Sequence, residues 1–285
     1  MTRFGSIALV MCAACACGVV SGQDLAAPRH GGKLLLTAGT SQIEGAAGAA
    51  LTPWAVIGGY GTREQWGASA FHSELPLGAF RFQSSGALVG LRDRVELSIA
   101  RQRLRPDAAG PALGQDVFGV KWRISGDAVF DQDRPWPQLA LGVQHKRAER
   151  GALLRDLGAR DAHGTDVYLA ATKLYLDSGL LASGALRYTR ANQFGLLGFG
   201  GPRGGARLQW EGSLAWLVHR RWAVGAEYRA KPDQLPGLPE DDAWDVFALW
   251  APNKHFSLSF GLAELGRIGG EDRQRGTYVS AQIGY

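Results

Sequence analysis

The chain has 285 residues, 46% of them hydrophobic, and a formal net charge of +5. A balance this mild, with basic residues that are not clustered, excludes a protein that binds nucleic acid. Mean hydropathy is −0.10, and beyond residue 20 no apolar run approaches the ~20 residues that a spanning helix needs, which excludes a helical membrane protein.

Residues 1–22 have the pattern of a secretory signal peptide. Arg3 is the only charge before Asp24, the run from Phe4 to Val20 is apolar, and small residues follow up to Gly22. Cleavage near Gly22 would leave a single domain over residues 23–285, and the net charge would fall from +5 to +4 because only Arg3 is lost. The three cysteines are Cys12, Cys15 and Cys17. We therefore expect no disulfide, no thiolate metal site and no cysteine nucleophile after cleavage.

Two segments upstream of residue 66 can be interpreted in two ways. Residues 33–43 and 54–60 flank a stretch rich in Gly and Ala at 45–50, and could add one hairpin to a sheet. They could equally fold as a plug inside a barrel. We favour the hairpin because an added pair keeps the strand number even.

From residue 66 onward, apolar and polar residues alternate with the period of strands. The clearest case is 207–218, where Leu208, Trp210, Leu214 and Trp216 share one face and Arg207, Gln209, Glu211 and Ser213 the other. That stripe is roughly 33 Å long, and a tilt near 40° reduces it to about 25 Å, the height of the apolar band of an outer-membrane barrel. Twelve strands are predicted, near 66–74, 80–91, 94–103, 116–125, 136–147, 166–176, 180–190, 207–218, 222–230, 243–251, 255–264 and 276–285.

The gaps between these strands alternate in length. Residues 104–115, 148–165, 190–206, 231–242 and 265–275 form long gaps, whereas 177–179, 219–221 and 252–254 form short ones. The gap at 126–135 is long for its place in this order. Outer-membrane barrels have short periplasmic turns and longer extracellular loops, whereas a soluble sandwich has no reason to keep this parity. The sequence therefore predicts an all-β protein, a transmembrane antiparallel up-and-down β-barrel of 12–14 strands, with 14 favoured.

The last nine residues alternate up to an aromatic carboxy terminus. Tyr278, Ile283 and Tyr285 belong to this strand, which resembles the signal that the outer-membrane assembly machinery reads. The resemblance implies that this machinery is a partner.

Four segments carry a wider resemblance: Gly58–Arg63, Arg94–Arg101, Gln115–Lys121 and Asn192–Gly201. With them the chain resembles an uncharacterised proteobacterial family of predicted outer-membrane proteins, domain of unknown function 3034. The resemblance implies the outer membrane of a Gram-negative bacterium, with outer-membrane lipid and lipopolysaccharide as surroundings. It carries over no catalytic residue.

Charged residues on the predicted inner face give the best chemical signal. They are Arg94, Glu96, Lys121, Arg123, Lys146, Arg187, Arg207, Glu211, Glu227 and Arg229. Buried charge without water or partners is unfavourable, so the lumen must be wet or densely ion-paired. We expect a passive channel or transporter for small hydrophilic or amphipathic solutes, with modest anion preference because cations are in excess. The alternative is a closed structural or adhesive barrel that acts through its outer loops.

No catalytic motif, cofactor or metal site is expected. A hydrolase at the barrel rim is a third possibility, in which His72, His145 or His163 would serve. Two acidic groups could hold calcium but lack a recognised loop and are expected to be solvated turns: Asp127, Asp131 and Asp133, and Glu240, Asp241, Asp242 and Asp245. The glycine-rich segment 192–205 is expected to be an adaptable loop or a lumen constriction.

Overall fold

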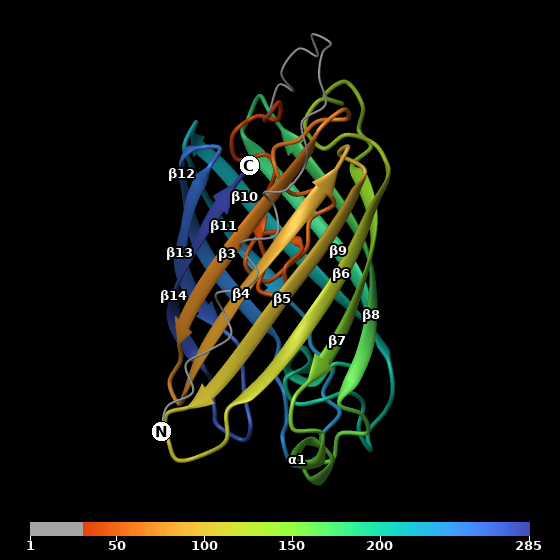
Figure 1. The fold of residues 1–285 in the computed structure, drawn as a ribbon, viewed down its shortest axis with the longest axis vertical. Coiled ribbons are helices and arrows are strands. Elements are labelled where there is room, and N and C mark those ends of the chain that lie inside the picture. Colours follow the sequence, from red (N-terminus) through yellow and green to blue (C-terminus); the bar gives the residue numbers. More distant parts are fainter. Residues whose placement is uncertain (1–30) are drawn as a thin grey trace, which may run out of the picture.

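The computed structural model describes residues 31–285, so the predicted signal peptide lies outside the described residues. Twelve antiparallel strands form a closed barrel in which each strand pairs with its neighbours in the chain (Figure 1). The strands are β3 (Trp66–Pro76), β4 (Phe80–Leu91), β5 (Val95–Pro106), β6 (Leu113–Ser125), β7 (Gln138–Ala148), β8 (His163–Tyr175), β9 (Leu180–Thr189), β10 (Arg207–His219), β11 (Trp222–Arg229), β12 (Ala243–Asn253), β13 (Phe256–Glu264) and β14 (Arg275–Gly284).

Alternation along each strand separates an apolar outside from a polar inside. On β10, Leu208, Leu214 and Trp216 are exposed, whereas Glu211 and Ser213 are buried. A soluble protein would turn these apolar side chains inward, and the reverse arrangement is the one that lipid requires. None of the helices among the described residues is long and apolar enough to cross a membrane.

The barrel closes between its first and last strands. β14 pairs with β3 from Val279 and Glu74 to Gly284 and Ser69, and Ala68 and Tyr285 exchange two further backbone hydrogen bonds of 2.9 and 2.8 Å. Ile283 and Tyr285 are exposed on the outside, but Tyr278 is buried in the interior. That the assembly machinery engages the end of this strand stays a prediction.

The two ends of the barrel differ in their connections. At the end where the chain terminates, turns at 92–94, 176–179, 220–221 and 254–255 are short, and only 126–137 is longer. At the other end lie 107–112, 149–162 with α1 (Gly151–Asp156), 190–206 with the 3-10 helix η1 (Asn192–Gly195), 230–242 and 265–274, besides the short 77–79. We call these the short-turn end and the long-loop end; the short-turn end is uppermost in Figure 1.

The favoured prediction of fourteen barrel strands is wrong. The segment 33–60 lies inside the barrel, where β1 (Thr40–Ser41) and β2 (Ala47–Gly48) form a separate two-stranded ladder (Figure 1). Gly45 at φ 95° and Gly59 at φ 77° reverse the chain in conformations that an extended strand does not allow. Small side chains such as Ala47 and Ala55 let the segment fit within the lumen. We call residues 33–60 the plug.

Replacing Leu214 by Arg should destabilise the protein by about 2–4 kcal/mol, because this outward side chain lies midway along β10 and would place a charge in the middle of the bilayer. Leu208→Arg, at the long-loop end of the same strand, should cost only ~0–1 kcal/mol. Urea unfolding from lipid vesicles measures both. Equal losses at the two positions would show that β10 does not cross the bilayer as described.

Candidate functional site: the plugged lumen

The long-loop half of the lumen holds three cations and three carboxylates, each with a side chain at most 3% exposed. They are Lys146, Arg187 and Arg229 with Glu44, Asp166 and Glu211, and we call them the central ion cluster. Glu44 comes from the plug and contacts all three cations: Lys146, Arg229 at 3.0 Å and Arg187 at 3.6 Å. The other five side chains come from β7 to β11, so the plug completes a charge balance that the wall leaves unfinished.

A second ion pair is hydrogen-bonded to backbone groups of the plug. Glu96 of β5 lies 3.0 Å from Lys121 of β6, and both are 1% exposed. Glu96 accepts hydrogen bonds from the backbone N–H groups of Ala47 and Gly58, while Lys121 donates to the carbonyls of Ala47 and Trp54. A buried pair is tolerated when its remaining donors and acceptors are satisfied, and here the plug satisfies them.

At the short-turn end, the plug begins in a third group of charges. Lys33 of the plug lies 2.8 Å from Asp93, which also pairs with Arg123 of β6. Arg123 bonds Asp127 at 2.8 Å, and Asp127 accepts the backbone N–H groups of Val129 and Phe130. The long turn 126–137 is thus folded compactly against the entrance of the plug.

The plug is attached to one side of the wall more than to the other. Every strand from β4 to β11 is linked to it: Ser84 and Gln102 bond Ile43, Lys121 bonds Ala47, Gln138 and Thr172 bond Ala55, Arg187 pairs with Glu44, Ser213 accepts from Trp54, and Glu227 accepts from Leu51 and Thr52. Ser41 of the plug also donates its backbone N–H to Gln282 of β14 at 2.7 Å, and its hydroxyl lies 3.5 Å from that of Ser69 of β3. Between the plug and strands β12 and β13, no hydrogen bond occurs in the part of the chain that is described.

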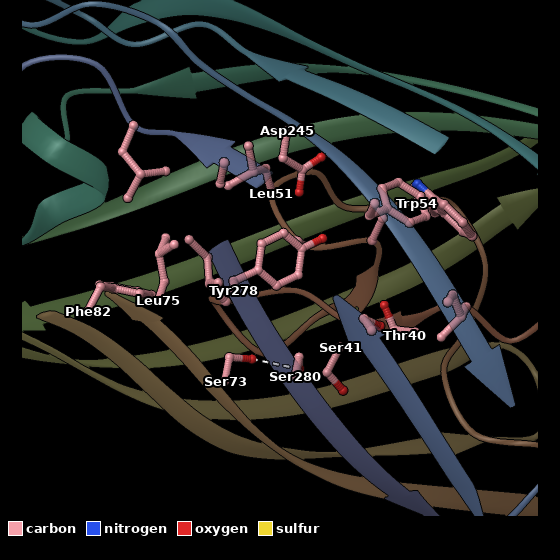
Figure 2. A pocket seen from close by; sticks show the side chains of 18 residues that line it. Thr40, Ser41, Leu51, Trp54, Ser73, Leu75, Phe82, Asp245, Tyr278 and Ser280 are labelled. Atoms are coloured by element: carbon pink, nitrogen blue, oxygen red, sulfur yellow. Dashed lines mark hydrogen bonds between the residues drawn. The ribbon is translucent and has the colours of Figure 1, made fainter. Parts of the chain in front are cut away.

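A narrow cavity lies between the plug and the part of the wall formed by β12 to β14 and β3. It offers about 30 Å³ to the centres of water molecules, where a single water needs ~10–15 Å³. Figure 2 shows Asp245 and Tyr278 pointing toward this cavity beside Leu51, with Ser73 hydrogen-bonded to Ser280 at 2.7 Å. Neither carboxylate oxygen of Asp245 has a hydrogen-bond partner among residues 31–285, although the side chain is buried. The gap suits water and is too narrow for an open pore.

A loop narrows the lumen at the long-loop end. Residues 191–201, which we call the mouth loop, are buried throughout. The ring of Phe194 lies under the guanidinium of Arg229 at 4.5 Å, and its carbonyl accepts from Lys146 at 3.2 Å. Gln193 and Phe194 adopt left-handed φ values of 44° and 60°, a strained conformation for side chains of this size. The glycine-rich segment thus forms a lumen constriction, and Lys146 of β7 contacts both this loop and Glu44 of the plug.

Two groups of the loop 230–242 hold the mouth loop in place. Glu240 accepts the backbone N–H of Gln193 on both oxygens, at 2.9 and 2.8 Å. Lys231 donates to the side chain of Gln193 and to the carbonyl of Leu265, both at 2.7 Å, and lies 3.8 Å from Glu240. Burial raises the pKa of Glu240 to about 7 against the opposing charge of Lys231. Burial likewise lowers the pKa of Lys231 to about 8, although Glu240 opposes the shift.

Comparison with known proteins decides the family. The family model described as "Protein of unknown function (DUF3034)" matches residues 37–282. The chain belongs to this family. Among curated proteins, none matches it.

Two solved porin structures have a fold similar to that of this DUF3034 protein. A KdgM porin in complex with disordered oligogalacturonate is 9% identical with a TM-score of 0.51, and the match covers 75% of this chain and 98% of that one. A NanC porin is 8% identical with a TM-score of 0.51, over 76% of this chain and 98% of that one. These likenesses show that the chain shares the closed-barrel fold of the two porins.

Two of the predicted lumen charges lie outside the lumen of this DUF3034 protein. Arg94 is exposed in the turn 92–94, with its guanidinium 5.9 Å from the ring centre of the outward Trp122. Arg207 is exposed at the long-loop rim and donates to the carbonyl of Arg203. Both have the parity of the inner face, but each lies where its strand begins and the wall no longer encloses it. The other eight are buried: Glu96, Lys121, Arg123, Lys146, Arg187, Glu211, Glu227 and Arg229.

The sequence missed other lumen charges. Asp166 and Asp245 begin strands that are apolar on both faces and could not be oriented, although pairing of Asp245 with Glu227 would have placed it inside. Glu44 was missed because its segment was expected in the wall. Across residues 31–285, no three His, Cys, Asp or Glu side chains gather in a way that could hold a metal ion.

The mouth loop should open more easily as pH rises between 4.5 and about 7. The pKa of Glu240 is about 7 in the closed loop and 4.5 when the side chain is free in solution. Between these two pH values the closed state binds more protons than the open state, so a rise in pH favours opening. The opening constant should rise by at most about tenfold per pH unit. Above about pH 8 the trend should reverse, because closed Lys231 loses its proton before free Lys231 does.

Hydrogen exchange of residues 191–201 across this pH range measures the effect. Glu240→Gln should remove the rise between 4.5 and 7, whereas Asp233→Asn, which alters a neighbouring carboxylate without a hydrogen bond to Gln193, should retain it. A flat profile in the unmodified protein would contradict the assignment.

Proposed function

We propose that this protein is a gated channel or transporter of the outer membrane. The plug closes the lumen from the short-turn end, and the mouth loop narrows it at the long-loop end. The observation that carries the proposal is the uneven attachment of the plug, which is bonded to β3 through β11 and to β14 but separated by a water-sized cavity from β12 and β13. A structural plug would gain most by binding all round.

The route for solute follows from the same asymmetry. Moving the plug toward β4–β11, or withdrawing it, would break the bonds of Ser41 to Gln282 and Ser69 and widen the cavity along β12 to β14 and β3. Its lining combines Ser73, Ser259 and Ser280 with Phe247 and Leu249, so that hydroxyl groups alternate with apolar surface. A path of this character suits small hydrophilic or amphipathic solutes.

Modest anion preference follows from the charge of the central ion cluster. Glu44 is the only carboxylate of the cluster that the plug supplies. When the plug leaves, Lys146, Arg187 and Arg229 face only Asp166 and Glu211. The remaining positive charge raises the local concentration of anions, and salt weakens the effect as the Debye length shrinks.

Reversal potentials under a salt gradient, measured on the chain that lacks residues 33–60, test this proposal. Anion preference is expected at low ionic strength, and the double change Arg187→Gln and Arg229→Gln should shift it toward cations. Arg94→Gln with Arg207→Gln is the matched control, since both side chains lie outside the lumen. A shift of equal size in the control would show that surface charge, not the central ion cluster, sets the selectivity.

A permanently closed barrel that acts through its outer loops is the second candidate. The many bonds between plug and wall favour it. It predicts that no condition releases the plug and that the protein never conducts.

A further inference from the structure

A hydrogen-bonded chain of three side chains lies on the outer surface of the barrel, away from the lumen. His72 Nδ1 is 2.7 Å from Ser85 Oγ, and His72 Nε2 is 3.0 Å from Glu74 Oε1. His72 of β3 and Ser85 of β4 are register partners, and Glu74 lies two residues along β3 on the same face. The register of the β3–β4 hairpin therefore builds this arrangement.

The partners of His72 define the role of each atom. A carboxylate only accepts hydrogen bonds, so Nε2 carries the imidazole hydrogen and Nδ1 is free to accept the proton of Ser85. Gln83, opposite Glu74, donates to Glu74 Oε1 at 2.7 Å and fixes that carboxylate. Nucleophile, base and orienting acid in this order are the arrangement of serine hydrolases on unrelated folds.

The position on the wall indicates the substrate. Toward the middle of the barrel the next outward residues are apolar, namely Ala70, Ala87 and Ile99. Toward the long-loop end the outward residues of β4 and β5 are Gln83 and three arginines, Arg81, Arg103 and Arg105, and no ion pair of these arginines occurs among the described residues. Ser85 thus lies at the border between apolar and charged surface, where a bilayer changes from acyl chains to head groups. Guanidinium groups bind phosphate strongly.

We propose that Ser85 is the nucleophile of a lipid-facing esterase site whose substrates are acyl esters of phosphate-bearing membrane lipids. Ser85 Oγ attacks the ester carbonyl while its proton passes to His72 Nδ1. The ester C–O bond then breaks, and the alcohol leaves with that proton. Water attacks the acyl carbon and gives one proton to His72. The bond between the acyl carbon and Ser85 Oγ then breaks, Ser85 Oγ takes the proton back from His72, and the carboxylic acid leaves.

Arg101 supplies positive charge at this site. It is the register partner of Ser85 on β5, and Asp116 at 3.0 Å and Glu149 hold its guanidinium. We assign to it the stabilisation of the oxyanion that forms on the carbonyl. Glu74 acts as a positioning residue because it touches only His72 and Gln83.

Refolded full-length protein tests the site by two readouts, labelling with a fluorophosphonate and release of fatty acid. Phospholipid vesicles and purified lipopolysaccharide are offered separately, which distinguishes the two lipid sources. Labelling should map to Ser85, and Ser85→Ala should lower fatty-acid release by about 10³-fold or more. Glu74→Gln should lower kcat and the labelling rate of Ser85 by about 100-fold or more while KM is kept.

His145 provides the matched control. Its Nδ1 lies 3.0 Å from Thr165 Oγ1 on the same outer surface, but in the described part of the chain it bonds no carboxylate. His145→Ala should leave both readouts unchanged. Heat-modifiable migration on gels checks that every variant folds, since none of these side chains contacts the plug. Full activity in Ser85→Ala, or folded protein that neither labels nor releases fatty acid from either lipid, would overturn the proposal; the result is independent of conductance.

Discussion

Deleting residues 33–60 should convert a barrel without measurable conductance in a planar bilayer into one with discrete, stable conductance steps. The plug supplies Glu44 to the central ion cluster and backbone partners to Glu96, Lys121 and Glu227. Without it, these wall charges need water in place of protein partners, because buried charge without a partner is strongly unfavourable. The lumen should therefore fill with water. β3 keeps its pairing with β14 after the deletion, so the wall can still close.

A chain shortened at 107–112 is the control for this deletion. That loop is exposed at the long-loop end and does not reach the plug, so the shortened chain should stay closed. If the plugless barrel is silent, removal of residues 191–201 as well tests whether the mouth loop still blocks it. Silence of that doubly opened, folded barrel would eliminate the channel and leave the closed structural barrel.

Glu44→Ala should destabilise the folded protein by about 3–5 kcal/mol, the usual loss when one partner of a buried ion pair is removed. Lys146, Arg187 and Arg229 would then share only two carboxylates in a site at most 3% exposed. Denaturant unfolding followed by tryptophan fluorescence measures the loss. Glu64→Ala is the control, because Glu64 is exposed and should change stability by less than ~0.5 kcal/mol.

A double change separates charge balance from packing. Glu44→Ala combined with Lys146→Met removes one charge of each sign, and should be less destabilising than the sum of the two single changes. Additive losses would mean that Glu44 acts through packing in the plug and not through the cluster. In that case the origin proposed for anion preference would also fail.

The sequence determined the wall of the barrel because lipid on one side and a polar interior on the other impose a period of two on every strand. Leu214 and Glu211 of β10, for example, have the faces that alternation assigned to them. The alternation shows on which face of a strand a side chain lies, but it does not show whether the barrel wall encloses that position. Arg94 and Arg207 have the inner parity and yet lie at strand ends, outside the lumen.

The sequence could not decide what fills the barrel. Residues 33–43 and 54–60 are compatible with strands, and only the closed pairing of β14 with β3 shows that no place in the wall remains for them. The partners of Glu44 are 102 and 185 residues away at Lys146 and Arg229, distances over which spacing carries no information.

The outer-surface site, too, is predicted from the sequence only in part. The sequence singled out His72 as a rim histidine but gave it no nucleophile, because Ser85 is 13 residues away and becomes its neighbour only through the hairpin register. The strands, their faces and the apolar band can therefore be predicted from the sequence, because each depends only on the medium that a residue contacts. Which distant polar groups meet cannot be predicted in this way, since the balance of buried charge depends on the whole closed barrel and on the segment folded within it.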